Sequence, residues 1–331
     1  YASDGGAQTW AVVGSAVVTG LFWQQLAFVG HDVGHNSVSH VHKLDAYWGA
    51  FFGNAAGGIA LGWWKDNHNT HHVVCNSIEH DPDIQHMPFF AVDERILGKY
   101  WSTYYEKYFT TDFVARTTVS YQHLLFYPVM ALARINLYVK SYEHLVVNTH
   151  KYGPHRRMQL ASLAVFALWV GGFLATAFSD AKTRLGWFLL SHAVAGVLHV
   201  QICISHFPMY VFRGRAYAWG EPEASWYRLQ LKTSLDVDCH PWLDWFHGGL
   251  QFQVEHHLFP RVPRHNLRYL RTLLKEVCAK HEVEYHEATF VECNKMLLSC
   301  MKDVGMKARQ TTKGDGGFYS SQIYDGMHLI G

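Results

Sequence analysis

Long apolar segments constrain this chain more than any other feature of its sequence. Five stretches come close to or exceed the roughly 20 helical residues that cross the roughly 30 Å hydrocarbon core of a bilayer. They are residues 10–30, 46–64, 119–139, 158–179 and 185–204. Charged residues make up 17% of the chain and hydrophobic residues 49%, whereas an ordinary soluble domain carries about 25% charged residues. The sequence therefore predicts an all-α, integral membrane helical bundle.

Histidine is the second unusual feature, with 24 copies in 331 residues. Most of the chemistry lies in three clusters whose members are spaced by three or four residues, so that each cluster shares one face of a helix. The clusters are His31 and His35; His68, His71 and His72; and Gln253, His256 and His257. Imidazole binds iron, zinc and copper, and seven imidazoles exceed what one tetrahedral zinc can use. The pattern predicts a site for two metal ions.

The clusters also restrict the topology, because a shared metal centre requires all three to lie on one side of the membrane. The stretch 46–64 connects the first two clusters and therefore cannot cross. The stretch 119–139 contains Arg134, and an arginine near the bilayer centre costs about 2.5–3.5 kcal/mol on insertion scales. Both stretches are expected to be interfacial helices. The expected spans are about 10–30, 158–179 and 185–204.

The three clusters resemble the histidine boxes of membrane-bound, oxygen-dependent lipid desaturases. The third box begins with a glutamine, Gln253, and in this it resembles the third box of the front-end branch of that family. The flanking runs 63–67 (WWKDN) and 258–260 (LFP) also resemble the family. The runs 80–86 (HDPDIQH), 102–105 (STYY) and 233–263 are most similar to sphingolipid delta-8 desaturases of the fungal or protist type. The resemblance covers about residues 21–307.

This resemblance implies two non-haem iron ions, dioxygen, and electrons from cytochrome b5 and its reductase. It implies a long-chain lipid substrate, either a ceramide or an acyl lipid. It also implies residence in the endoplasmic reticulum membrane, with a histidine-rich di-iron cap facing the cytosol. Family members usually carry a fused cytochrome b5 domain and a further membrane helix before the first box, so an N-terminal part is expected to be missing here. We expect one desaturase domain over 1–310 and a flexible, polar tail over 311–331.

The resemblance also implies an additional histidine ligand near the last span. His206 lies where that span meets the cytosol, and His199, seven residues earlier on the same face, is its competitor. The box histidines are the expected catalytic residues. The expected metal ligands are His31, His35, His68, His71, His72, His206, Gln253, His256 and His257.

Five polar residues next to the boxes are candidates to accept the N–H of an imidazole whose other nitrogen binds the metal. The alternative is that they are ordinary polar groups at helix ends. The five residues are Asp32, Asp66, Asn67, Asn69 and Glu255. His80, Asp81 and Asp83 are expected either to orient the second box or to fix a turn around Pro82. Most other histidines, His144 and His247 among them, are expected at the surface or the membrane interface.

The predicted function is desaturation of the long-chain base of sphingolipids at the delta-8 position. One alternative is a front-end desaturase acting on acyl-CoA or phospholipid chains, and another is a related di-iron lipid hydroxylase. A remote alternative is a metal transporter, whose ligands would lie within the spans. Positive and negative side chains nearly cancel at a net charge of +1, so nothing indicates a nucleic acid partner. Six scattered cysteines without a C-x-x-C pair indicate neither a disulfide scaffold nor a zinc ribbon.

Overall fold

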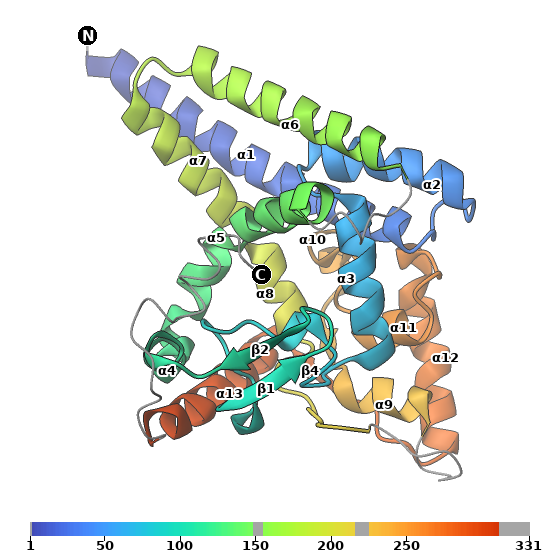
Figure 1. The fold of residues 1–331 in the computed structure, drawn as a ribbon. Coiled ribbons are helices and arrows are strands. Elements are labelled where there is room, and N and C mark those ends of the chain that lie inside the picture. The colour runs from blue at the N-terminus through green and yellow to red at the C-terminus, as the bar shows by residue number, and fades with distance from the viewer. Residues whose placement is uncertain (1, 148–154, 216–224, 311–331) are drawn as a thin grey trace. The chain divides into compact units, whose positions relative to one another are not determined.

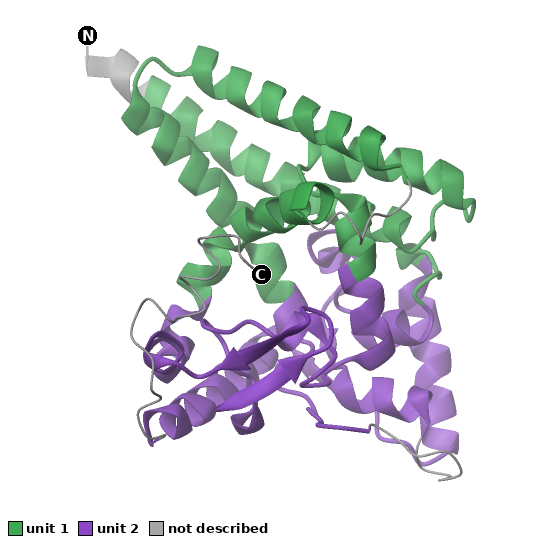
Figure 2. Ribbon diagram, viewed as in Figure 1, with its two compact units in different colours: residues 1–66, 127–201, 260–265 green, residues 67–126, 202–259, 266–331 purple. Residues whose placement is uncertain are grey.

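The computed structural model of this chain describes residues 2–147, 155–215 and 225–310 (Figure 1). The chain divides into two compact units, each assembled from separate chain segments (Figure 2). Unit 1 comprises residues 1–66, 127–201 and 260–265, and unit 2 comprises residues 67–126, 202–259 and 266–331. The predicted flexible tail, 311–331, lies outside the described residues.

Unit 1 is helical, as predicted. Its elements are α1 (Ala2–Gly34), α2 (His42–Gly49), the π-helix η1 (Ala50–Ala56), the π-helix η4 (Glu143–Val147), α6 (Arg156–Ala177) and α7 (Ala181–Ala195). Three further α-helices of the described residues run from one unit into the other, among them α8 (Val197–Cys203), which begins in unit 1 and ends in unit 2. Helix α3 (Leu61–Val74) begins in unit 1 and ends in unit 2, while α5 (Gln122–Tyr142) begins in unit 2 and ends in unit 1.

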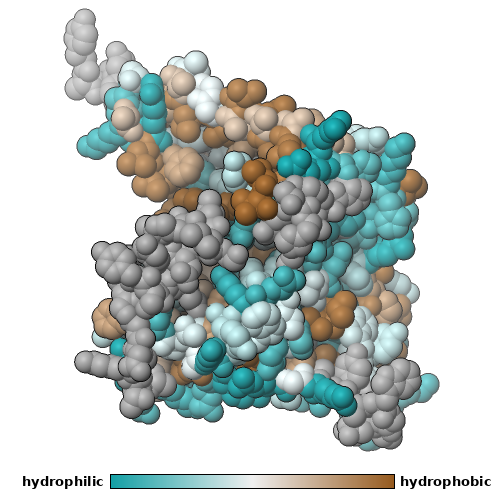
Figure 3. All heavy atoms as spheres, in the orientation of Figure 1, coloured by the Kyte–Doolittle hydropathy of each residue, from teal (hydrophilic) through white to brown (hydrophobic). Residues whose placement is uncertain are grey.

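Within the described residues, three helices are long and apolar enough to cross a membrane. They are Gln8–Gly34 within α1, Arg156–Ala177, and Ala181–Cys203 across α7 and α8, and they correspond to the three predicted spans. Side chains of α6 point outward, since 6% of its apolar window is buried inside the protein. Hydrophobic side chains accordingly gather along α6 on the face shown in Figure 3. Such a surface is stable against lipid rather than against water.

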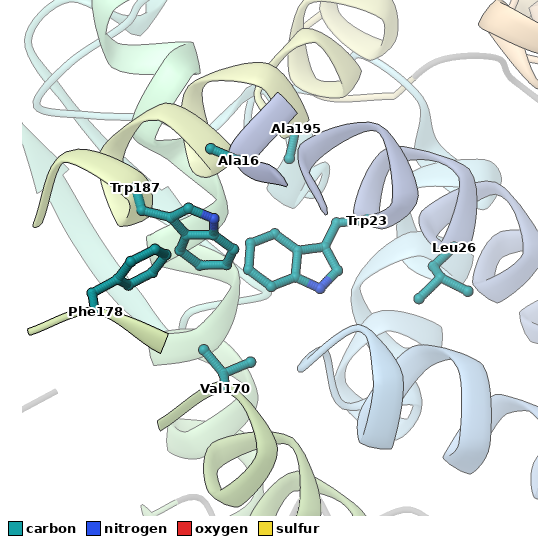
Figure 4. Packing of buried hydrophobic residues seen from close by; sticks show 7 residues of the cluster. All are labelled: Ala16, Trp23, Leu26, Val170, Phe178, Trp187 and Ala195. Carbon is teal, nitrogen blue, oxygen red and sulfur yellow. The ribbon is translucent and has the colours of Figure 1, made fainter. Parts of the chain in front are cut away.

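Aromatic and small residues hold α1 against α7. Trp23 of α1 and Trp187 of α7 are buried and meet edge to face, with ring centroids 6.2 Å apart. Gly20 permits this approach, because a Cβ there would lie 2.6 Å from the backbone oxygen of Ser191. Both tryptophans belong to one buried cluster (Figure 4), whose other members are Ala16, Leu26, Val170, Phe178 and Ala195.

The two segments expected to be interfacial are not among the candidate spans found in the described residues. Residues 46–64 are divided among α2, η1 and the start of α3, and the chain turns at Gly58, whose φ is +77°. In α5, Arg134 is buried; its guanidinium donates to the Gly57 carbonyl and lies 5.0 Å from the ring centroid of Trp23. That these segments lie in the membrane interface stays a prediction.

Unit 2 combines short helices with two small sheets. In one sheet β1 (Lys99–Ser102) pairs antiparallel with β2 (Lys107–Thr110), and in the other β3 (Asp236–Asp238) pairs parallel with β4 (Glu287–Thr289). The α-helices are α4 (Phe113–Ser120), α9 (Trp226–Thr233), α10 (Asp244–His247), α11 (Gln253–Leu258), α12 (Leu267–Lys280) and α13 (Phe290–Gln310). The 3-10 turns are η2 (Pro82–Ile84), η3 (Glu94–Ile96), η6 (Pro241–Leu243) and η7 (Arg264–Asn266), of which η7 begins in unit 1.

The short helix α11 is fixed by apolar contacts on two sides. Val254 and Leu258 of α11 pack with Leu231 of α9 and Leu274 of α12 in one buried cluster. Six residues form an unstable helix by themselves, so tertiary packing determines where α11 lies. The third histidine cluster is thereby held on a rigid element.

Candidate metal centre

The first histidine cluster lies at the end of α1 in unit 1. His31 occupies the last turn of α1, and His35 follows directly after the helix. Their ring centroids are 4.7 Å apart, as the predicted four-residue spacing requires. Asp32 lies between them in sequence, with Oδ1 3.8 Å from His31 Nδ1 and Oδ2 3.1 Å from Arg264 Nε.

In unit 2, the second and third clusters meet. His68, His71 and His72 lie on α3, and α11 carries Gln253, His256 and His257. The Nε2 atom of His72 is 3.1 Å from Nε2 of His68 and 3.1 Å from Nε2 of His256. Three imidazole nitrogens from two helices thus converge, an arrangement that a metal ion stabilises.

A second convergence in unit 2 includes the predicted additional ligand, His206. The ligating atoms of His71, His206 and His257, together with the Cys75 sulfur, all lie within 4.8 Å of one another, and the four residues are buried. Gln253 Oε1 lies 3.3 Å from His206 Nε2. The box histidines of unit 2 and His206 therefore separate into two sets of three. The predicted competitor, His199, lies on α8 in unit 1 and is not part of this set.

Each ring of the second set is held by its outer nitrogen. His71 Nδ1 lies 2.9 Å from Asp81 Oδ2, and His257 Nδ1 lies 2.8 Å from Gln230 Oε1. His206 Nδ1 lies 3.1 Å from the Thr233 carbonyl oxygen. Outer partners of this kind fix the tautomer of a metal-binding histidine and leave Nε2 for the metal.

The buried nitrogen of His257 tests whether this cluster fits a metal. Its Nε2 atom is buried and has no hydrogen-bond partner among the described residues. A buried polar atom without a partner costs about 1–3 kcal/mol, and coordination to a cation removes that cost. The donor set of neutral imidazoles likewise matches a transition metal ion, so the cluster is compatible with a metal centre.

Burial sets the protonation of these rings. It lowers the pKa of His206 to about 4 and, together with the neighbouring histidines, holds the pKa of His257 well below its usual value. Both rings are therefore neutral at pH 7, the form that binds metals. Burial acts in the same direction on His71, but the Asp81 and Asp83 carboxylates outweigh it and raise the pKa of His71 to about 9.

Asp81 both orients the second box and fixes the turn, the two roles left open by the sequence. Its carboxylate contacts His71 and accepts the backbone N–H of Asp83, which caps η2. Asp83 Oδ2 lies 3.8 Å from Nδ1 of His68 and 3.8 Å from Nδ1 of His71. His80 instead contacts Thr103, with Nδ1 2.8 Å from Oγ1.

Glu255 holds α11 rather than an imidazole. The Tyr285 hydroxyl lies 2.7 Å from Glu255 Oε1 and 2.6 Å from Asp236 Oδ2. Asp236 Oδ1 accepts the backbone N–H of Val254, at 3.0 Å, in the first turn of α11. Burial and the Asp236 charge raise the pKa of Glu255 to about 9, so one proton is shared within this group. Of the other predicted neighbours, Asp66 and Asn69 are exposed and Asn67 is buried.

Several residues near the cluster were not anticipated from the sequence. Gln230 accepts from His257 and donates to the His72 carbonyl oxygen at 3.0 Å. Cys75 lies with its sulfur 3.5 Å from His206 Nδ1, and burial raises the pKa of its thiol well above the usual range. The surface prediction for His144 and His247 is wrong, since both are buried.

Comparison with known proteins agrees with this geometry. Residues 8–289 match the fatty acid desaturase family. The chain belongs to this family. It is 44% identical over 298 residues to the Delta 8-(E)-sphingolipid desaturase of Komagataella phaffii, which covers 88% of this chain and 53% of that protein.

Two plant desaturases are similar to the chain to nearly the same extent. The Acyl-lipid (9-3)-desaturase of Borago officinalis is 40% identical over 318 residues, covering 96% of this chain and 68% of that protein. The Delta(8)-fatty-acid desaturase 2 of Arabidopsis thaliana is 39% identical over 304 residues, covering 92% of this chain and 66% of that protein. The chain spans about half the length of the Komagataella phaffii relative.

Proposed function

We propose that this chain is an oxygen-dependent di-iron front-end desaturase that introduces a double bond into the long-chain base of sphingolipids, at the delta-8 position. The observation that carries this proposal is the pair of histidine sets in unit 2. A family member with two sets of three imidazoles, one of them buried and anchored by Asp81, Gln230 and the Thr233 carbonyl, has the donors for a two-metal centre. The identity to sphingolipid delta-8 desaturases supports the substrate class.

The reaction fixes what the protein must accomplish. Two hydrogen atoms leave adjacent methylene groups, and dioxygen takes them up with two electrons and two protons to give two water molecules. Bound iron would supply an oxidant strong enough to break an unactivated C–H bond, which acid–base side chains cannot do. The proposed ligands are the nine predicted from the sequence: His31, His35, His68, His71, His72, His206, Gln253, His256 and His257.

The remaining side chains orient this set. Asp81 holds the proton on His71 Nδ1 and so keeps Nε2 available as a ligand atom. Gln230 does the same for His257, and its link to the His72 carbonyl ties α9 to α3. Displacement of a reacting group by about 1 Å can cost roughly a hundredfold in rate, so rigid outer contacts are part of the proposed mechanism.

Electron supply, location and orientation belong to the same proposal. We infer that cytochrome b5 and its reductase deliver the electrons, and that the protein resides in the endoplasmic reticulum with its histidine clusters facing the cytosol. The clusters of the second and third boxes and His206 lie outside the three candidate spans, which favours a desaturase over a transporter with ligands at mid-membrane.

The substrate alternative is an acyl lipid. It is favoured by the two plant relatives, whose names refer to acyl-lipid and fatty-acid substrates and whose identity is 39–40%. The histidine clusters do not separate the two, because both reactions remove hydrogen from an unactivated methylene pair. A related di-iron lipid hydroxylase would use the same ligands and differ only in its product.

Lipid analysis tests the proposal. The chain is expressed together with cytochrome b5 in yeast that lacks sphingolipid desaturase, and long-chain bases and fatty acids are profiled together. A new double bond at C8 of the long-chain base is expected, absent for His71→Ala and retained for the exposed control His281→Ala. A double bond confined to fatty acids would move the substrate to the acyl-lipid class, a hydroxylated product would replace desaturation by hydroxylation, and activity in His71→Ala would contradict the ligand assignment.

A further inference from the structure

A tryptophan of the second-box helix contacts both rings of the first box. Trp64 lies on α3, one turn before His68. Its ring centroid is 5.3 Å from that of His31 and 5.2 Å from that of His35, with interplanar angles of 69° and 84°. Edge-to-face contacts of this kind are favourable and directional, so the indole restricts how each imidazole can turn.

Gly34 makes this contact possible. A Cβ at Gly34 would lie 2.0 Å from the Cζ3 atom of Trp64 and 2.6 Å from its Cε3 atom. The glycine is in the last helical turn of α1, where the backbone conformation itself accepts alanine. The indole is therefore the obstacle to a side chain at this position, and the six-membered part of the indole occupies that space.

The start of α3 is fixed by side chains from three other elements of unit 1. The backbone N–H groups of residues 60, 61 and 62 donate to Ser141 Oγ at 2.8 Å, Asn54 Oδ1 at 3.0 Å and Gln159 Oε1 at 2.8 Å. These are the first N–H groups of a helix, which have no acceptor within it. Since all three acceptors are buried, the first turn of α3 and with it Trp64 are held in one place.

An ion pair also lies next to the first box. Arg264 Nε lies 3.1 Å from Asp32 Oδ2, and Asp32 Oδ1 lies 3.8 Å from His31 Nδ1. The arginine belongs to residues 260–265 of unit 1, which follow the third box in sequence. The first box therefore contacts both the Trp64 indole and a carboxylate that is paired with an arginine.

We propose that Trp64 is a positioning residue for the first histidine box, and that Gly34 is required because it lets the indole reach both imidazoles. The inference rests on the proposed metal-binding function of His31 and His35. It assigns to Trp64 no contact with the substrate and no part in proton transfer. Its effect acts through the orientation of two ligands, and residues that orient histidine ligands typically contribute about tenfold to a hundredfold in metal affinity.

The test measures metal retention in the complete chain, loaded anaerobically with ferrous iron and challenged with increasing chelator. Gly34→Ala displaces the indole without removing a ligand and is expected to lower iron affinity at least about tenfold. Trp64→Phe has a smaller ring that leaves the space at position 34 empty, so Gly34→Ala combined with Trp64→Phe should match Trp64→Phe alone. Gly14→Ala, on the same helix with nothing within 4 Å of its Cβ, is the matched control and should equal the wild type.

Three results would overturn the inference: iron retention in Gly34→Ala equal to that in Gly14→Ala, a double variant that binds iron more weakly than Trp64→Phe alone, or a double variant that fails to fold although Trp64→Phe folds. If Gly34→Ala alone does not fold, recovery of folding and iron binding in the double variant supports the inference. A wild-type chain that retains iron but forms no double bond would contradict the proposed function and leave the role of Trp64 standing.

Discussion

The contact between Asp81 and His71 gives the sharpest prediction about the metal centre. Asp81 is fully buried and accepts from His71 Nδ1, from the Asn76 N–H at 2.6 Å and from the Asp83 N–H at 2.8 Å. Asp81→Asn keeps the shape of the side chain and removes its charge. It also directs an amide NH₂ at a donor, and an unsatisfied buried donor costs about 1–3 kcal/mol.

The magnitude follows from the pKa of His71. Burial lowers it, but the Asp81 and Asp83 carboxylates raise it to about 9 from the usual value of 6.5, a preference for the protonated ring of about 3 kcal/mol. A metal ion must displace that proton below about pH 9. Metal affinity of the wild type should therefore rise by up to about tenfold per pH unit between about pH 7 and 9.

In Asp81→Asn the pKa of His71 falls and this proton competition disappears. The variant should show a flatter pH dependence over the same interval. Near pH 9, where the proton no longer competes in either protein, the variant should bind about tenfold to a hundredfold more weakly, because the outer contact of the ligand is lost. The difference between the two proteins is therefore largest at the upper end of the interval.

The assay is the absorption of Co²⁺ bound by the purified chain, buffered with a chelator at about pH 7, 8 and 9. Asp93→Asn is the matched control. Asp93 accepts the backbone N–H of Arg95 at the start of η3, as Asp81 accepts that of Asp83 at the start of η2, but Asp93 lies outside the histidine clusters. The control should follow the wild type. An Asp81→Asn variant with the slope and affinity of the wild type would refute the reasoning.

Three other variants test separate parts of the structure. Gly196→Ala places a Cβ 2.6 Å from the backbone of Ala131 and should destabilise the chain by about 1–3 kcal/mol, measured by thermal unfolding in detergent. The control Gly186→Ala, whose Cβ meets nothing within 4 Å, should keep the melting temperature of the wild type. Equal melting temperatures for the two variants would contradict this packing. Burial lowers the pKa of His247 to about 4, so the unfolded chain, with a value near 6.5, takes up the proton first as the pH falls. Stability should then decrease by up to about 3 kcal/mol between about pH 6.5 and 4, and His247→Asn should lose this dependence; parallel curves for the two proteins would exclude it. Gln230→Leu removes the acceptor of a third-box imidazole and should weaken Co²⁺ binding about tenfold to a hundredfold, with Gln230→Glu retaining it; unchanged binding in Gln230→Leu would show that this acceptor is dispensable.

The spans and the histidine boxes could be predicted because their signals are local. Hydropathy over about 20 residues identifies a membrane helix, and a spacing of three or four residues places two histidines on one helical face. His31 and His35 illustrate the second rule, with ring centroids 4.7 Å apart. The resemblance to the desaturase family implied a further histidine ligand near the last span, and unit 2 brings His206, which lies at the end of that span, to His71 and His257.

Contacts between distant segments could not be predicted in this way. Gln230 lies on a short helix whose own sequence gives no sign that its amide meets His257, 27 residues later. The partner of His206 is a backbone carbonyl, that of Thr233, which has no sequence signal at all. Arg134 indicated that its helix does not span the membrane, but no pattern in the sequence indicated its acceptor, the Gly57 carbonyl, which lies 77 residues earlier in the chain.

The burial of histidines outside the boxes depends on the same long-range packing. His247 ends α10 and packs edge to face against Phe290, with ring centroids 5.6 Å apart, so an aromatic ring 43 residues later decides its exposure. A histidine-rich composition alone indicates neither burial nor exposure, because His is intermediate on burial scales.

The di-iron centre is tested most directly by the metal content of the purified chain, measured together with its ⁵⁷Fe Mössbauer spectrum. The two histidine sets of unit 2 and the first box predict two iron ions per chain in nitrogen-rich, high-spin sites, and loss of iron in His71→Ala. A chain that retains a single metal ion, or zinc in place of iron after growth with both, would contradict the proposed di-iron desaturase.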